Sequence, residues 1–166
     1  MTTDQSFRQA QGAALRLLSY RPRSEAELRG RLNRRFPSHT VEGVLRSLKR
    51  QSLVNDQEFA MLWAESRDRQ RPRSAAAIRR ELVAKGVAPE TAASAASIVD
   101  DEESAMRSAA RFARRIADTD FVSFHRKLHG YLQRRGYSGG VTRRTISSLW
   151  DDLSRNAAAS TLADSQ

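Results

Sequence analysis

The chain has 166 residues, and its 29 Lys and Arg against 19 Asp and Glu give a formal net charge of +10. It has no cysteine, which excludes disulfides, thiolate metal sites and a cysteine nucleophile, and no apolar run reaches the roughly 18 residues needed to span a bilayer. Residues 1–11 are polar and lack the apolar stretch of a secretory signal, so we expect a soluble, cytoplasmic protein with no membrane partner. Its basic surface favours polyanions or acidic proteins as partners.

A tetrapeptide recurs in the chain. Arg21-Pro22-Arg23-Ser24 returns as Arg71-Pro72-Arg73-Ser74, an offset of 50 residues (71 − 21). Apolar pairs with the i, i+4 spacing of one helix face keep the same offset: Leu28 and Leu32, Ile78 and Leu82, Leu128 and Leu132. A period of this length is typical of stacked repeats that cannot bury their apolar faces alone. The sequence therefore predicts one helical unit used three times.

The first repeat, residues 12–54, is predicted to hold three helices. The first helix ends near Tyr20, because Pro22 blocks its continuation. Ser24 and Glu27 have the spacing of a capping box that starts the second helix, and a third helix follows the Pro-Ser break at 37–38. The residues expected to face inward on the second and third helices are Leu28, Leu32, Val41, Val44, Leu45 and Leu48.

The second repeat, residues 55–99, follows the same plan. Asn55 and Glu58 are expected to cap its first helix, and Ser74 its middle helix. Gly86 is expected to end the middle helix in the left-handed conformation. The expected inward residues are Phe59, Ala60, Leu62, Trp63, Ile78, Leu82, Ala92, Ala95, Ala96 and Val99.

The third repeat, residues 100–154, begins with four acids that complement a helix N-terminus. The run 118–120 is expected to cap its middle helix, which ends at Gly136. The expected inward residues are Ala109, Phe112, Ala113, Ile116, Phe121, Phe124, Leu128, Leu132, Ile146, Leu149, Trp150 and Leu153. Residues 1–11 and 155–166 are expected to be a flexible N-terminal tail and a frayed C-terminal tail. The predicted fold is thus all-α: a tandem, elongated array of three three-helix repeats, with curvature left open.

No catalytic pattern is found in the sequence. A phosphate-binding Gly-x-x-x-x-Gly-Lys-Ser/Thr loop is absent. His125 and His129 are four residues apart and could share a metal, but two imidazoles make a weak site and no Glu follows His125. We interpret them as surface histidines on a basic helix, and expect no metal, no cofactor and no enzymatic activity.

Basic residues concentrate in two segments. Residues 21–50 hold nine Lys/Arg against three acids, and residues 107–144 hold ten against two. Guanidinium groups suit phosphates and carboxylates, so we predict that the partner is contacted there and at the second middle helix. The predicted contact residues are Arg31, Arg34, Arg35, Arg79, Arg80, Arg126, Lys127, Arg134, Arg135, Arg143 and Arg144.

Several segments resemble the bacterial RecX regulators, over about residues 15–153. The segment Leu53-Val54-Asn55-Asp56-Gln57-Glu58-Phe59-Ala60 carries the resemblance, and residues 78–87 are similar to that family's second repeat. Ser52 stands where the family often has glycine. The resemblance implies a regulator that binds the RecA recombinase filament on single-stranded DNA. It would inhibit or modulate RecA's recombinase, ATPase and co-protease activities, in DNA repair and the SOS response.

One other class of function remains open at this point. Residues 24–35, the Pro-Ser turn and the helix from about Thr40 could form a helix-turn-helix, as in a DNA-binding transcription regulator. An enzyme such as a nuclease would need an acid–metal constellation that the sequence does not offer. We expect a monomer. Whether DNA or RecA supplies most of the affinity is not set by these patterns.

Overall fold

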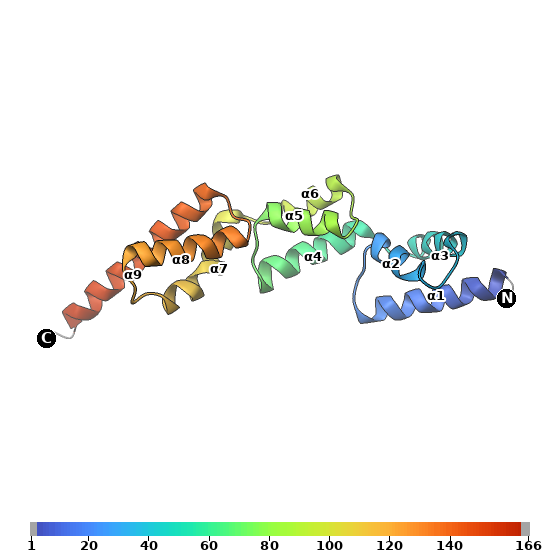
Figure 1. The fold of residues 1–166 in the computed structure, drawn as a ribbon, viewed down its shortest axis with the longest axis horizontal. Helices are drawn as coiled ribbons and strands as arrows, with labels where there is room; N and C mark the ends of the chain where they lie inside the picture. Colours follow the sequence, from blue (N-terminus) through green and yellow to red (C-terminus); the bar gives the residue numbers. More distant parts are fainter. Residues whose placement is uncertain (1–2, 164–166) are drawn as a thin grey trace. The chain divides into compact units, whose positions relative to one another are not determined.

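The computed structural model describes residues 3–163, and over that range it contains nine α-helices and no strand (Figure 1). The helices are α1 (Thr3–Tyr20), α2 (Glu25–Leu32), α3 (Ser38–Arg50), α4 (Asp56–Gln70), α5 (Ala75–Ala84), α6 (Pro89–Ala96), α7 (Asp101–Arg115), α8 (Phe121–Arg134) and α9 (Gly139–Ala163). The all-α prediction is confirmed. The chain forms two compact units: an N-terminal unit of residues 1–64 and 79–96, and a C-terminal unit of residues 65–78 and 97–166.

In the N-terminal unit, α1, α2 and α3 pack around one apolar core. Each helix contributes residues with helical spacing: Ala10, Ala14, Leu28, Leu32, Val41, Val44, Leu45 and Leu48. The predicted inward faces of α2 and α3 are therefore confirmed. Phe7 also packs against this core, and α1 begins at Thr3, inside the range expected as a flexible tail. The apolar contacts of Phe7 and Ala10 explain why the helix extends there.

In the C-terminal unit, α7, α8 and α9 pack around a second core. Its buried residues include Ala109, Phe124, Leu128, Leu132, Tyr137 and Ile146. The hydroxyl of Tyr137 is satisfied by a 2.8 Å hydrogen bond with Ser104 Oγ. Leu28, Ile78 and Leu128, which are related by the offset of 50, are each fully buried. The apolar register of the repeats is thus carried into the structure.

Three helices end in the same way, with one residue in the left-handed region. These residues are Ser52, Gly86 and Gly136, with φ of 57°, 81° and 87°. In each case the next backbone N–H donates back to a carbonyl five positions earlier, as at Val87, which bonds Leu82 at 3.1 Å. The predicted ends at both glycines are confirmed. Ser52 is the one described residue other than glycine with a positive φ, a conformation that favours glycine.

Four further details differ from the sequence predictions. Helix α9 continues to Ala163, through most of the range 155–166 that was expected to be a frayed tail. Leu62 and Phe121, expected inward, are 45 and 46% exposed. The buried side of α4 is centred on Ala60 and Ala64, which turns Leu62 outward, while Phe121 opens α8 and packs edge-on against Trp150. Helix α2 ends at Leu32, so Arg34 and Arg35 lie in the turn that follows and not on the helix.

The repeated tetrapeptide forms a junction between two middle helices. In the N-terminal unit, Ser24 Oγ accepts from Glu27 N at 3.1 Å and donates to Lys85 O at 2.6 Å, joining the start of α2 to the end of α5. The backbone N–H of Glu25 donates to Asp56 Oδ1 at 2.8 Å, which ties the same corner to the start of α4. Glu27 completes the predicted capping box.

The second copy of the tetrapeptide makes a similar junction in the C-terminal unit, with a backbone N–H in place of the serine hydroxyl as the donor. The N–H of Ser74 donates to Arg135 O at 3.1 Å, joining the start of α5 to the end of α8. The N–H of Ala75 donates to Asp101 Oδ1 at 2.8 Å, at the start of α7. Because unpaired groups at helix ends are costly when buried, each junction satisfies two helix ends at once.

A substitution at Gly86 tests the close packing of the N-terminal junction. A Cβ at this position would lie 2.3 Å from Ala26 Cβ, and the residue has φ of 81°, so Gly86→Ala suffers both a clash and backbone strain. We expect the free energy of unfolding, measured by urea denaturation, to fall by about 2 kcal/mol or more. Gly30→Ala is the matched control, because a Cβ at this position would meet nothing within 4 Å beyond the helix's own neighbouring backbone, and it should be neutral or slightly stabilising. Equal stability of Gly86→Ala and the parent chain would contradict the proposed close packing.

Candidate functional site

The predicted contact residues lie on the surface and are shared between the two compact units. Ten of the eleven are exposed, and Arg135 is half-buried. Arg31, Arg34 and Arg35 gather in the N-terminal unit, while Arg134 and Arg135 gather in the C-terminal unit.

In the N-terminal unit, Arg31, Arg34 and Arg35 line a cavity of about 450 Å³ between α1 and the end of α2. Arg16, from α1, and the rings of Tyr20 and Phe36 line it as well. A neighbouring cavity of about 850 Å³ shares Arg16 and Arg35 and adds Arg8 and His39. This surface combines forked cationic donors with aromatic rings.

In the C-terminal unit, a cavity of about 680 Å³ is lined by nine arginines and by no carboxylate. Two of these arginines, Arg134 and Arg135, were predicted from the sequence. The other seven are Arg67, Arg69, Arg71, Arg73, Arg107, Arg111 and Arg115. Asp68 forms a 2.7 Å ion pair with Arg107, and this pair offsets part of the positive charge of the cavity. We call this the C-terminal arginine cavity.

A stack of planar groups lies in the wall of the C-terminal arginine cavity. The rings of Phe112 and Tyr131 are parallel, with centroids 4.6 Å apart. The Arg135 guanidinium lies 3.6 Å from the centroid of the Tyr131 ring, and that of Arg115 lies 5.5 Å from the Phe112 ring. The Tyr131 hydroxyl donates to Ser108 O at 2.9 Å. Arg135 Nη1 donates to Tyr131 O at 3.3 Å, so stacking and hydrogen bonding together hold Arg135 in a defined orientation.

The other predicted residues contribute differently. Arg144 is paired with Glu102, which raises the pKa of the guanidinium. The remainder are exposed and lie outside these three cavities: Arg79, Arg80, Arg126, Lys127 and Arg143. The rings of His125 and His129 stack with centroids 5.9 Å apart. Over residues 3–163, no three His, Asp or Glu side chains are grouped as metal ligands.

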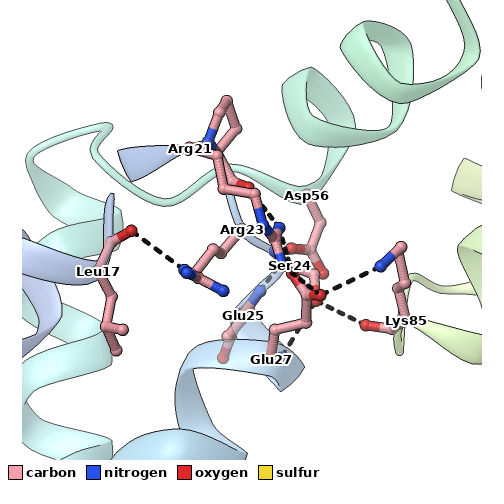
Figure 2. Close-up of polar contacts among 9 residues, drawn as sticks. Leu17, Arg21, Arg23, Ser24, Glu25, Glu27, Asp56 and Lys85 are labelled. Carbon is pink, nitrogen blue, oxygen red and sulfur yellow. Dashed lines mark hydrogen bonds and ion pairs between the residues drawn. The ribbon is translucent and has the colours of Figure 1, made fainter. Parts of the chain in front are cut away.

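At the N-terminal junction, both arginines of the tetrapeptide form hydrogen bonds with other groups of the protein (Figure 2). Arg21 donates two hydrogen bonds of 3.1 Å to the Glu27 carboxylate, and Lys85 Nζ donates a third at 3.2 Å. Arg23 is 8% exposed and donates to Leu17 O at 3.1 Å, so it serves the fold. Burial acts to raise the pKa of Glu27, but the hydrogen bonds and charges of Arg21 and Lys85 outweigh it and lower the pKa to about 2.

Sequence reasoning missed most of the arginines in the C-terminal cavity. One signal was available, because Arg107, Arg111 and Arg115 have the i, i+4, i+8 spacing of one helix stripe. The run from Arg67 to Arg73 carried no such signal. It reaches the cavity because the C-terminal junction brings the end of α4 to α7 and α8.

The fold and these surfaces define a class: an all-α repeat protein with arginine-rich cavities. Among the described residues, no helix is both long and apolar enough to cross a membrane. Residues 10–48 match the first three-helix domain of RecX, and residues 55–95 match the second.

Whole-chain similarity agrees with the domain matches. A Regulatory protein RecX from Amycolatopsis mediterranei is 36% identical over 165 residues, which cover 97% of this chain and 93% of that protein. The Regulatory protein RecX of Streptomyces lividans is 37% identical and covers 87% of this chain and 79% of its own length. A crystal structure of RecX from Lactobacillus salivarius superposes with a TM-score of 0.77 at 21% identity, covering 88% of this chain and 97% of that one. The chain belongs to the RecX family of regulatory proteins.

The low pKa of Glu27 gives a pH-dependent prediction. Since its pKa is lowered from 4.5 to about 2 on folding, its contribution to stability is complete above about pH 4.5 and is lost as the pH falls toward 2. Glu27→Gln should lower the free energy of unfolding by about 1–3 kcal/mol at neutral pH, because Arg21 and Lys85 lose an ionic acceptor. The difference from the parent chain should shrink between pH 5 and pH 2, as followed by urea denaturation at each pH.

The matched control for Glu27 is Glu65→Gln, at an exposed position on α4. It should change the stability by less than about 0.5 kcal/mol at any of these pH values. A stability difference for Glu27→Gln that stays constant from pH 7 to pH 2 would contradict the role of the carboxylate charge.

Proposed function

We propose that this protein binds the RecA filament on single-stranded DNA and inhibits or modulates its recombinase, ATPase and co-protease activities. It does so as a cytoplasmic monomer, by binding and without catalysing a reaction of its own. Membership of the RecX regulatory family is the starting point for this proposal. The observation that carries it further is the gathering of guanidinium groups in cavities on both compact units.

The chemistry of these surfaces fits a filament of protein and nucleic acid. Arginine forks bind phosphates and carboxylates with two parallel hydrogen bonds, so they suit both the DNA backbone and acidic protein surface. The net charge of +10 adds attraction toward a polyanion and speeds encounter at low salt. Two separate cationic surfaces on one chain can engage more than one point of the same assembly, which raises the overall affinity.

The central test is RecA's single-strand-dependent ATP hydrolysis, measured with and without this protein. We expect inhibition at protein concentrations well below that of RecA, because one bound molecule affects a filament of many protomers. No change in ATP hydrolysis at equimolar protein, with RecA from the same source, would contradict the proposal. A footprint at one discrete duplex sequence would instead favour a transcription regulator.

The N-terminal cationic surface gives a directed prediction. Replacing Arg31, Arg34 and Arg35 together by Glu should weaken inhibition of RecA by at least roughly tenfold in the concentration required, because three attractive contacts become repulsive. All three side chains are exposed, so helical content by circular dichroism should not change. The matched control replaces the same three residues by Lys, which keeps the charge and should retain most of the inhibition. Full inhibition by the Glu variant would rule out this surface.

A further inference from the structure

The two junctions differ at one position that matters for charge. Glu27 of the N-terminal junction corresponds to Ala77 of the C-terminal junction, at the repeat offset of 50. In the N-terminal junction, the Glu27 carboxylate accepts from Arg21 and Lys85 at 3.1 and 3.2 Å (Figure 2). The C-terminal junction keeps its serine cap, since Ala77 N donates to Ser74 Oγ at 3.1 Å, but has no carboxylate at that position.

The two cations of the N-terminal junction have cationic counterparts in the C-terminal one. Arg71 corresponds to Arg21, and Arg135 corresponds to Lys85. Both line the C-terminal arginine cavity. Within the described part of the chain, neither is joined to a carboxylate by an ion pair, and Asp68 is engaged by Arg107. The two cations of the N-terminal junction are therefore neutralised by a carboxylate of the same unit, whereas their counterparts in the C-terminal unit keep their positive charge.

We propose that the C-terminal arginine cavity binds a phosphate group of single-stranded nucleic acid, in the place that the Glu27 carboxylate takes at the N-terminal junction. This inference rests on the proposed function, since it assigns the strand-binding site within it. The N-terminal junction supplies the template, in which one anion bridges the equivalents of Arg71 and Arg135 and completes the corner.

Two features favour a nucleic-acid phosphate over a carboxylate of an acidic peptide. Of the nine lining arginines, Arg107 is paired with Asp68 and Glu103. Among the described residues, Arg69, Arg71, Arg111 and Arg134 are not paired with a carboxylate, and these four provide more forked donors than one carboxylate can use, whereas successive phosphates of a strand can each take two. The stack of Phe112, Tyr131 and Arg135 presents a planar cationic surface on which an unpaired base can lie. A duplex buries its bases and cannot use that surface, so the site favours a single strand.

The test is a substitution that adds a carboxylate to the C-terminal junction at the position equivalent to Glu27. Ala77→Glu should allow the new side chain to pair with Arg71 and Arg135, as Glu27 pairs with Arg21 and Lys85. We expect the affinity for a short labelled oligothymidylate, measured by fluorescence anisotropy, to fall by roughly tenfold or more, and the salt dependence of binding to weaken by about one phosphate contact. Ala77→Gln is the matched neutral control and should bind within about twofold of the parent chain.

A reciprocal variant and a surface variant complete the design. Glu27→Ala opens the N-terminal junction and should strengthen oligothymidylate binding, because it frees Arg21 and Lys85. Ala77 is only 6% exposed, so if Ala77→Glu does not fold, Arg71→Glu at an exposed position replaces it and should give the same roughly tenfold loss. Circular dichroism and urea denaturation establish that each variant compared is folded.

The outcomes separate this inference from the proposed function. Oligothymidylate affinity and salt dependence unchanged in a folded Ala77→Glu or Arg71→Glu variant would overturn the site. The site would also be overturned, in favour of an acidic protein partner, by two observations together. The parent chain would bind polyglutamate but not oligothymidylate, and these substitutions would abolish the binding of polyglutamate. If the parent chain binds the strand through this cavity but leaves RecA's ATP hydrolysis unchanged, the site stands and the proposed function fails.

Discussion

The structure depends on a hydrogen-bonded contact between the start of one middle helix and the end of another. Helix ends carry backbone groups with no partner inside the helix, and a buried end is stable only if something else satisfies them. Here Ser24 meets the end of α5, and Ser74 meets the end of α8, in each case beside an acid that opens a third helix. Small three-helix groups bury limited apolar area, so such junctions are needed to make a stable array of them.

The same contact also decides how charge is distributed. Each junction brings together an arginine of the tetrapeptide and a basic residue near the end of a middle helix. At the N-terminal junction, the Glu27 carboxylate pairs with Arg21 and Lys85, so these cations stabilise the fold. At the C-terminal junction, the charge is left facing a cavity. One repeated structural element can therefore serve stability in one place and recognition in another, through a change of a single side chain.

How far the candidate site could be predicted depended on the range over which its residues interact. The basic segments around Arg34 and Arg135 were visible in the sequence as local excess charge, and the structure places both at cavities. Arg16 and Arg71 were not among the predicted contact residues, because no local pattern marks Arg16 and the repeated tetrapeptide marks Arg71 only as part of a helix boundary. They join the cavities only when α1 packs against the end of α2, and when α4 ends beside α7 and α8. Conversely, Arg23 belongs to a basic segment but is buried and serves the backbone.

The sequence by itself determined the helices, their caps and their apolar faces. These are local properties. Ser24 and Glu27 are three residues apart, Leu28 and Leu32 share a helix face, and glycine at position 86 permits the left-handed turn without strain. Only the tertiary structure decided which charges neutralise each other and which remain available. That outcome depends on contacts between residues about 60 apart in the sequence, such as Glu27 and Lys85, whose pairing no local pattern specifies.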